Sequence, residues 1–349
     1  MGNLLANNSA LINAMGWTIL HSLWQGLMLF CILKIALRFI TEEKAKLRYN
    51  ISLSVLSAHA IWVVVTFVNQ LETANQYIVA NAAAIDRIST TNSSVASTNT
   101  QYINQGFFAT IQLWVNNNTN IIVTAYVLGI AVLTIRLIYN LFSIKRIKKY
   151  SEHSKDIAWN SILLTQAKRL GISRHINLLL SRNITTPMVM GFFKPIIIFP
   201  FATINNLTTE QFEAILIHEL AHIKRHDYIV NIIQTVLEII LFYNPFVWLI
   251  SKTVRIEREH SCDDVVTNNT DKVPYAHALA TLATHAQNAP YPAIAATGDK
   301  YYLLNRIKRI IEMKKSPITK LQITTVIVLV LSLVLSITLI SPTLSAQTK

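Results

Sequence analysis

Residues 215–223 read Ile-Leu-Ile-His-Glu-Leu-Ala-His-Ile and contain the pattern His-Glu-x-x-His. A helix makes one turn in about 3.6 residues, so His218 and His222 leave the same face of it, one turn apart. Two imidazoles at this spacing suit one zinc ion, and Glu219 beside them can accept the proton of a water that attacks a carbonyl. The stretch therefore predicts the catalytic centre of a zinc peptidase.

The residues around this motif predict that it lies in a buried helix. Thr208-Thr209-Glu210-Gln211 forms a Thr-x-x-Gln capping box, and basic residues 224–226 gather at the far end, where the helix dipole favours positive charge. The apolar residues of the motif and its flanks can bury one side of the helix. The competing interpretation is a pair of core histidines with a chance glutamate between them.

A zinc peptidase typically supplies three protein ligands and leaves one position open. Glu259 is the best candidate for the third ligand, because Asp263 lies four residues further along the same helical face. From there the Asp263 carboxylate can accept the free N–H of a ligating histidine and fix its tautomer. Glu257 is the alternative third ligand, and His260 and Cys262 are weaker alternatives.

Peptidases of this chemistry also need a hydrogen-bond donor for the oxyanion that forms on the attacked carbonyl, and Tyr, His or Arg usually supplies it. The candidates are Tyr275 and His277, near the start of a predicted helix, and Arg306. The sequence does not choose between these three residues.

Composition favours a membrane protein with one soluble domain. Of the 349 residues, 52% are hydrophobic, and the mean hydropathy is +0.39. Cys31 and Cys262 are the two cysteines, which excludes a disulfide framework and fits a reducing interior.

The charge distribution predicts the orientation in the membrane. The formal net charge is +13, and 23 of the 31 Lys and Arg residues lie between positions 144 and 320, against one between 69 and 119. Positive residues beside membrane spans stay in the cytoplasm, so we expect the N-terminus outside and residues 144–320 inside. A basic run such as 145–149 after a span is typical of contact with membrane lipid, and we expect no direct binding of nucleic acid.

The predicted fold class is α+β, mainly α, with four transmembrane helices and a cytoplasmic, gluzincin-like zinc peptidase domain. The expected segments are residues 1–68 (two transmembrane helices with a short basic cytoplasmic loop), 69–119 (polar external loop), 120–143 (third transmembrane helix), 144–320 (peptidase domain), 321–341 (fourth transmembrane helix) and 342–349 (short external tail). Shorter elements are expected at 80–88 (helix), 161–170 (helix), 176–181 (strand) and 188–199 (two extended runs).

The apolar run 228–250 is long enough to cross a membrane. A single crossing would place Glu259 on the opposite side of the membrane from His218 and His222, and metal–ligand bonds of about 2 Å cannot close across it. Asn244-Pro245 offers a break. We therefore expect a hairpin of two helices, buried against the domain or dipping into the cytoplasmic leaflet, with a return crossing by two tilted helices as a minor alternative.

Four motifs in this order resemble the BlaR/MecR family of membrane-embedded zinc signalling peptidases. They are Leu-His-Ser-Leu-Trp-Gln-Gly (20–26), Thr-Pro-Met-Val-Met-Gly-Phe-Phe-Lys-Pro-Ile-Ile-Ile-Phe-Pro (186–200), His-Glu-Leu-Ala-His-Ile-Lys-Arg-His-Asp-Tyr (218–228) and Arg-Glu-x-x-Cys-Asp (258–263). By position, the resemblance implies His218, His222 and Glu259 as ligands of one zinc ion and Glu219 as the catalytic base.

The resemblance also implies a role in signalling from the bacterial inner membrane. In this family an outside event activates the inner peptidase, often with cleavage of the peptidase itself, and a DNA-bound repressor is lost. A cytoplasmic, BlaI-like transcriptional repressor is therefore the expected substrate and partner. The best-known members carry a penicillin-binding sensor after the last span, whereas we expect this chain, which stops about nine residues past Ile340, to lack it.

Two other functions compete with a signalling antirepressor. One is quality-control proteolysis of membrane proteins, and the other is a non-catalytic membrane receptor or scaffold with a structural zinc. The sequence leaves the activating stimulus, the cleavage site and the oligomeric state open.

Overall fold

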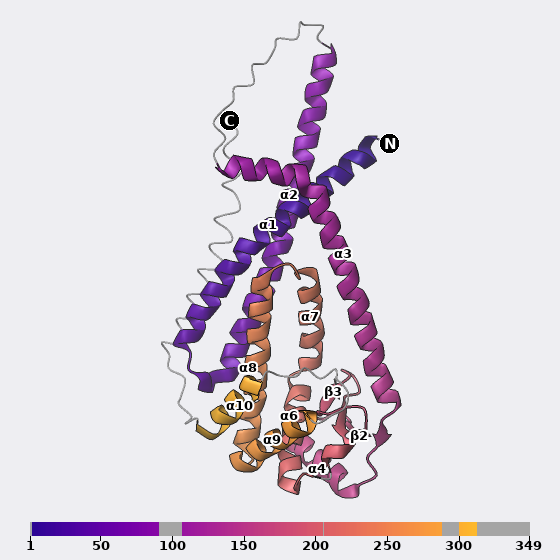
Figure 1. Cartoon of the computed structure of the whole chain (residues 1–349), viewed down its shortest axis with the longest axis vertical. Helices are drawn as coiled ribbons and strands as arrows, with labels where there is room; N and C mark the ends of the chain where they lie inside the picture. The colour runs from indigo at the N-terminus through magenta and orange to yellow at the C-terminus, as the bar shows by residue number, and fades with distance from the viewer. Residues whose placement is uncertain (1, 91–106, 205, 288–299, 313–349) are drawn as a thin grey trace.

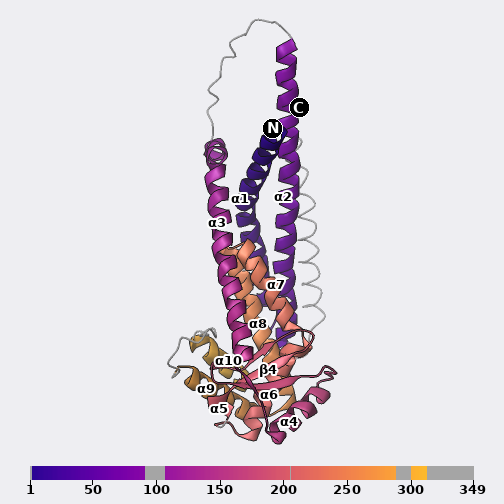
Figure 2. The same cartoon turned by 90° about the vertical axis from the view of Figure 1, so that its right-hand side faces the viewer.

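Three long helices rise from a smaller lower domain in the computed structural model, which describes residues 2–90, 107–204, 206–287 and 300–312 (Figures 1 and 2). They are α1 (Gly2–Phe39), α2 (Ala45–Thr90) and α3 (Phe107–Lys149), and the short helix η1 (Glu42–Lys44) joins the first two. Three stretches of the described residues are long and apolar enough to cross a membrane: Ser9–Phe39 in α1, Glu42–Gln76, which comprises η1 and the first part of α2, and Asn117–Lys149 in α3. The fourth predicted span, 321–341, and the tail 342–349 lie outside the described residues.

The described parts of the segment 69–119, residues 69–90 and 107–119, are more helical than the sequence predicted. Helix α2 continues to Thr90 and includes the short helix expected at 80–88, and α3 begins at Phe107. Residues 69–90 contain no glycine or proline, so nothing in this stretch ends the helix that the apolar span begins. The polar composition therefore gave the wrong secondary structure here, and the external location of the segment stays a prediction.

The lower domain contains a mixed sheet with strand order β1-β2-β4-β3. Its strands are β1 (Glu152–His153), β2 (Asn177–Ser181), β3 (Met188–Met190) and β4 (Ile196–Pro200). β2 and β4 are parallel, whereas the other two pairs are antiparallel. The strand predicted at 176–181 and the two extended runs predicted in 188–199 are confirmed.

Among the described residues, this domain also contains the helices α4 (Ile157–Arg169), α5 (Phe201–Ile204), α6 (Thr209–Lys224), α9 (Lys272–Gln287) and α10 (Lys300–Glu312). Helix α6 lies at the centre, and residues 214–221 are all buried. The predicted capping box at its start is present, because Thr208 accepts from the Gln211 backbone while the Gln211 side chain accepts from the Thr208 backbone. Phe199 of the sheet and Tyr275 of α9 belong to the apolar core around α6.

The predicted hairpin at 228–250 is confirmed as α7 (Asp227–Ile240) followed by α8 (Pro245–Asn269). Asn244 caps α8 by accepting from the Phe246 backbone N–H, and Pro245 occupies the first turn, which lacks intrahelical acceptors for its N–H groups. In both views the hairpin rises among the membrane helices (Figures 1 and 2). Its apolar residues form one buried cluster with α1 and α2: Leu29, Leu33, Leu56, Leu241, Val247, Ile250 and Val254.

The tip of the hairpin is held by close approaches to two glycines. A Cβ at Gly26 of α1 would lie 2.8 Å from the amide nitrogen of Asn244, and a Cβ at Gly129 of α3 would overlap the ring of Phe242. The Asn244 amide also donates to the Ser22 carbonyl at 2.7 Å. The long helix α8 therefore runs from a fixed point between the membrane helices down into the lower domain.

Candidate metal centre

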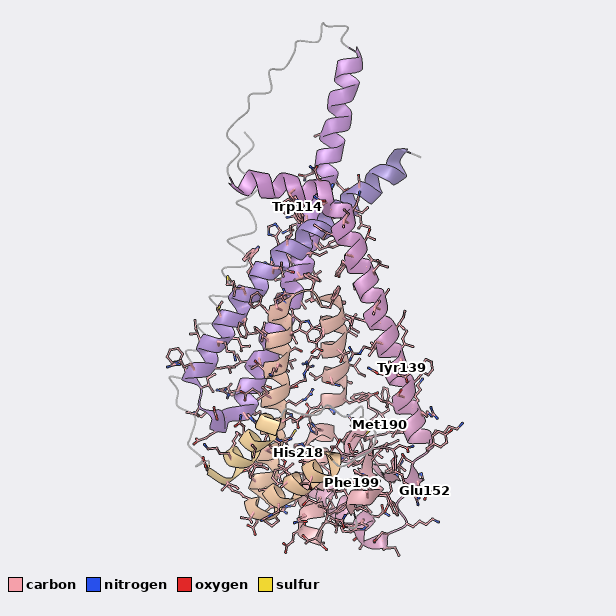
Figure 3. All side chains as sticks on the ribbon, viewed as in Figure 1. Trp114, Tyr139, Glu152, Met190, Phe199 and His218 are labelled. Carbon is pink, nitrogen blue, oxygen red and sulfur yellow. The ribbon has the colours of Figure 1, made fainter. Side chains whose placement is uncertain are left out.

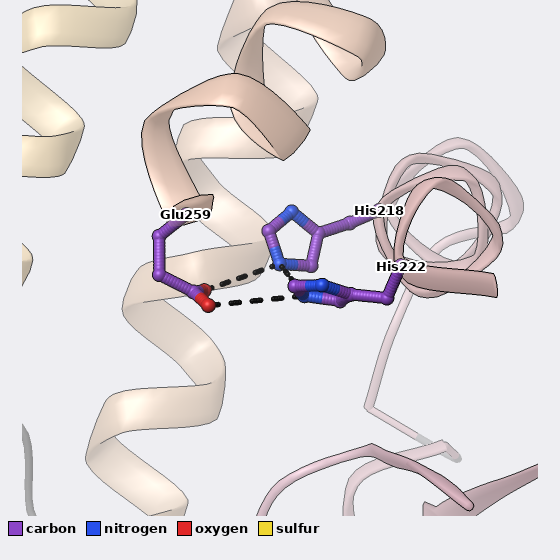
Figure 4. A group of neighbouring side chains, drawn as sticks. All are labelled: His218, His222 and Glu259. Atoms are coloured by element: carbon purple, nitrogen blue, oxygen red, sulfur yellow. Dashed lines mark hydrogen bonds and ion pairs between the residues drawn. The ribbon is translucent and has the colours of Figure 1, made fainter. Parts of the chain in front are cut away.

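Three side chains from two helices converge in the lower domain. His218 and His222 come from α6 and face Glu259 of α8 (Figure 4), and the His218 label lies in the lower part of the molecule, below the tip of the hairpin (Figure 3). The two Nε2 atoms are 3.2 Å apart, and the Glu259 oxygens lie 3.5 Å from Nε2 of His218 and 3.9 Å from Nε2 of His222. The structure thus brings together the three residues that the sequence predicted as ligands.

These distances fit a divalent metal ion. A tetrahedral zinc ion with Zn–N bonds of 2.0–2.1 Å holds two ligating nitrogens about 3.3 Å apart. The separation of 3.2 Å between the Nε2 atoms of His218 and His222 is close to this value. Two imidazoles and one carboxylate are also the donors that zinc prefers in catalytic sites.

The opposite nitrogen of each ring contacts a carboxylate. Nδ1 of His222 lies 2.8 Å from Asp227, and Nδ1 of His218 lies 3.3 Å from Asp263. A proton on each Nδ1 leaves both Nε2 lone pairs free for a metal, and carboxylates behind ligating histidines fix this tautomer. The contact between Asp263 and a motif histidine is the one that the sequence predicted.

Sequence reasoning missed Asp227, the partner of His222. Helix α6 ends at Lys224, and His226 adopts the left-handed conformation (φ 60°) before α7 begins at Asp227. This sharp reversal brings Asp227 back beside His222. An aspartate five residues after the second histidine was a visible signal, but the turn that aims it could not be read from helical spacing.

Asp263 is the centre of a buried hydrogen-bond network. Its side chain is fully buried, Tyr275 donates to it at 2.6 Å, and Arg306 donates to both of its oxygens at 2.7 and 3.0 Å. The Tyr275 oxygen also lies 2.9 Å from Nδ1 of His218 and can accept its proton. Arg306 reaches Glu259 as well, at 3.5 Å, so one guanidinium contacts both the third candidate ligand and Asp263.

The three candidate oxyanion donors have different surroundings. Tyr275 is fully buried and its hydroxyl is directed at Asp263, which is also the main partner of Arg306. His277 lies on an exposed position of α9. In this geometry Tyr275 and Arg306 hold the histidine and the two carboxylates in place.

The alternative ligands Glu257, His260 and Cys262 lie away from the converging Nε2 atoms. Glu257 pairs with Arg48 of α2 at 2.8 Å, and His260 lies 3.7 Å from Glu257. The Cys262 sulfur lies 3.4 Å from Nδ1 of His222, on the side of the ring that faces Asp227. Of the four candidates for the third ligand, Glu259 is the one that faces both Nε2 atoms.

The electrostatic environment favours a negative Glu259 and a protonated His218 in the metal-free protein. Burial alone would raise the pKa of Glu259, but the hydrogen bond with His218 and the nearby charges of His222 and Arg306 outweigh it and lower that pKa. Burial opposes a charge on His218, yet its hydrogen bonds with Asp263 and Glu259 raise its pKa to about 9. A metal ion that binds at Nε2 must displace this proton.

Glu219 is 7% exposed, and burial raises its pKa, which the charges of His222 and His218 partly oppose. A raised pKa brings a carboxylate nearer to neutral pH, where it is a more effective base.

Asp227→Asn is expected to lower zinc affinity by about 10- to 100-fold, because loss of an outer carboxylate partner leaves His222 poorly oriented and less basic. Competition with a chromogenic zinc chelator on the purified protein measures this change. Asp271→Asn, at an exposed position just after α8, is the matched control. Equal affinity in the Asp227→Asn and Asp271→Asn proteins would show that Asp227 does not orient His222.

Long apolar helices and a domain in which two histidines and a glutamate converge define the class of membrane-embedded metallopeptidases. Residues 19–310 match the model of the family described as BlaR1 peptidase M56, and the chain belongs to this family. The resemblance to the BlaR/MecR family is thereby confirmed.

Characterised relatives align with part of this chain. It is similar to regulatory protein BlaR1 of Bacillus licheniformis, with 28% identity over 217 residues that make up 60% of this chain and 36% of that protein. It is also similar to the methicillin resistance mecR1 proteins of Staphylococcus aureus and Staphylococcus epidermidis, with 30% identity over 166 residues, 48% of this chain and 28% of each relative. The alignments thus cover between 28% and 36% of the relatives' lengths.

Proposed function

We propose that this chain is a membrane-bound zinc endopeptidase that cleaves a cytoplasmic protein. The observation that carries the proposal is the convergence of the Nε2 atoms of His218 and His222 on the carboxylate of Glu259, while carboxylates hold both opposite ring nitrogens. Three protein ligands of this kind leave one position for water or substrate, as in catalytic rather than structural zinc sites.

Each of these side chains has a defined chemical role in the proposal. One zinc ion held by His218, His222 and Glu259 would polarise the scissile carbonyl and make water nucleophilic. Glu219 would accept the proton of the attacking water and deliver it to the leaving amine. Asp263 and Asp227 would keep the histidines in the metal-binding tautomer.

The proposed location is the bacterial inner membrane, with the N-terminus outside and the peptidase domain in the cytoplasm. The concentration of Lys and Arg in residues 144–320 supports this orientation. The three described helices that are long and apolar enough to span a bilayer support attachment to the membrane, where lipid would surround them. Both types of relative come from bacteria.

The proposed substrate is a cytoplasmic transcriptional repressor of the BlaI type, with self-cleavage as a further reaction. Family membership and the names of the relatives, a regulatory protein and methicillin resistance proteins, support a signalling role. In this role the peptidase acts as an antirepressor, because cleavage removes the repressor.

A strain that lacks the protein is expected to accumulate one cytoplasmic DNA-binding regulator after stimulation, because a signalling peptidase has few substrates. Quantitative proteomics of the deletion strain, complemented with wild type or with Glu219→Gln, measures this. Accumulation of many membrane proteins would contradict the signalling proposal and indicate membrane quality control instead.

A second candidate function is a membrane receptor or scaffold in which zinc is structural. One observation favours it: His222, Asp227 and Cys262 form a second group whose potential ligand atoms lie within 4.8 Å of one another. A closed four-ligand site that included Cys262 could not activate water. X-ray absorption of the zinc-loaded protein separates the two candidates, since only the structural site would show a zinc–sulfur distance of about 2.3 Å.

A further inference from the structure

One guanidinium connects the end of α1 and the start of α2 with the metal-bearing helix α8 through hydrogen bonds. Arg48 of α2 donates from Nε and Nη2 to a single oxygen of Glu257, both at 2.8 Å. Its Nη1 donates to the carbonyls of Leu37 and Ile40, at 2.8 and 2.7 Å, where α1 ends and leaves carbonyls without intrahelical partners. Arg48 therefore joins the end of α1, the start of α2 and the middle of α8.

This ion pair is shielded from water. The side chains of Arg48 and Glu257 are 13% and 4% exposed. The other oxygen of Glu257 lies 3.7 Å from Nδ1 of His260, so the contact with Arg48 is the closer of its two ion pairs. Removal of either partner would leave the other charge buried without its closest partner, which is strongly destabilising, so the folded protein favours keeping this contact.

Glu257 and Glu259 occupy opposite sides of α8. Two residues correspond to about 200° around a helix, so the side of α8 that carries Glu257 faces α2 while Glu259 faces the histidines of α6. A movement of α2 that Arg48 transmits to α8 must therefore change the distances between the Glu259 oxygens and the two Nε2 atoms, now 3.5 and 3.9 Å.

Two further arginines fix the same α1–α2 turn to the catalytic domain. Arg309 of α10 donates to Asp264 of α8 at 2.8 Å and to the Glu42 carbonyl at 3.0 Å. Arg225, which follows α6, lies 4.3 Å from the ring centroid of Tyr49. The turn and the start of α2 thus contact α8, α10 and the end of α6, so Arg48 is one of several contacts that hold this region in place.

We propose that Arg48 is a positioning residue, which holds Glu259 at the metal centre through Glu257 and couples the helix pair α1–α2 to it. The inference rests on the proposed peptidase function. It adds a membrane-helix residue to the machinery that sets metal affinity and turnover, although Arg48 touches neither metal nor substrate.

The test compares the full-length variants Arg48→Met, Glu257→Gln and the double variant, with Lys46→Met as the matched control on an exposed position of the same turn. Zinc affinity, the d–d absorption of Co²⁺-loaded protein, kcat and KM are measured well below each unfolding temperature. We expect each single change to lower zinc affinity and kcat by roughly two- to thirtyfold, with KM near the wild-type value. The double variant should lose no more zinc affinity and kcat than the more affected of the two single variants, because both changes break the same contact.

A merely structural Arg48 predicts a different result: a lower unfolding temperature with unchanged zinc affinity, cobalt spectrum and kcat in the folded protein. That result, or additive losses in the double variant, would overturn the inference. Arg48→Lys keeps the charge but cannot reach Glu257 and the carbonyls together, and it decides the question if the Met variant does not fold. A wild-type protein that binds no zinc would instead overturn the proposed function itself.

Discussion

Glu219→Gln is expected to abolish proteolysis while the protein still binds one zinc ion. The amide cannot accept a proton, so cleavage loses general base catalysis, which contributes about 10²- to 10⁴-fold. His218, His222 and Glu259 are untouched, and glutamine fills the same buried space. Cleavage of a co-expressed repressor, or of the protein itself, is followed by immunoblotting, and zinc is quantified in the purified protein.

Glu210→Gln is the control for this variant, because Glu210 lies exposed in the first turn of the same helix. It should cleave like wild type. Undiminished cleavage in Glu219→Gln would reject the role of Glu219, and loss of zinc together with cleavage would mean that the change disturbs the metal centre rather than the base.

For the hairpin α7–α8, the requirement that three metal ligands meet gave a better prediction than hydropathy. The run 228–250 has the length of a membrane span, but the need for Glu259 to meet His218 required the chain to turn back. Asn244-Pro245 supplied the break, and the structure places the cap of α8 there. The required contact between Glu259 and His218 thus corrected the membrane crossing that the apolar run 228–250 alone would predict.

Relations between site residues on the same helix could be predicted from the sequence. Contacts between residues on different elements were harder to predict. Helical spacing alone relates His218 to His222 and Glu259 to Asp263. The contacts of Asp227 with His222 and of Arg48 with Glu257 depend on a left-handed turn and on the packing of α2 against α8. Neither contact follows from helical periodicity, because the tertiary structure determines which residues lie next to a buried charge.

The position of α8 explains why the site and the membrane helices are parts of one structure. Its upper half packs in the apolar cluster with α1 and α2, and its lower half carries Glu257, Glu259 and Asp263. A continuous helix can transmit a displacement along its length, since its backbone hydrogen bonds resist bending. Of the three candidate ligands, Glu259 is therefore the one whose position depends most directly on the membrane helices.

Glu259→Ala is expected to remove stoichiometric zinc from the protein. With His218 and His222 alone, the site keeps two protein ligands, and the loss of affinity should exceed the roughly 10- to 100-fold that loss of an outer partner costs. The fold should survive, because Arg306 retains its hydrogen bonds to Asp263. Zinc content after dialysis, measured by atomic absorption on the folded protein, tests the prediction.

Glu257→Gln is the decisive comparison, because Glu257 is the alternative third ligand two residues away. In the structure it pairs with Arg48 and not with the histidines, so this variant should retain stoichiometric zinc with at most the modest weakening expected of a positioning contact. Zinc retained in Glu259→Ala but lost in Glu257→Gln would reverse the assignment. Zinc retained in both would mean that neither carboxylate completes the site, and Cys262, beside His222, would become the next ligand to test.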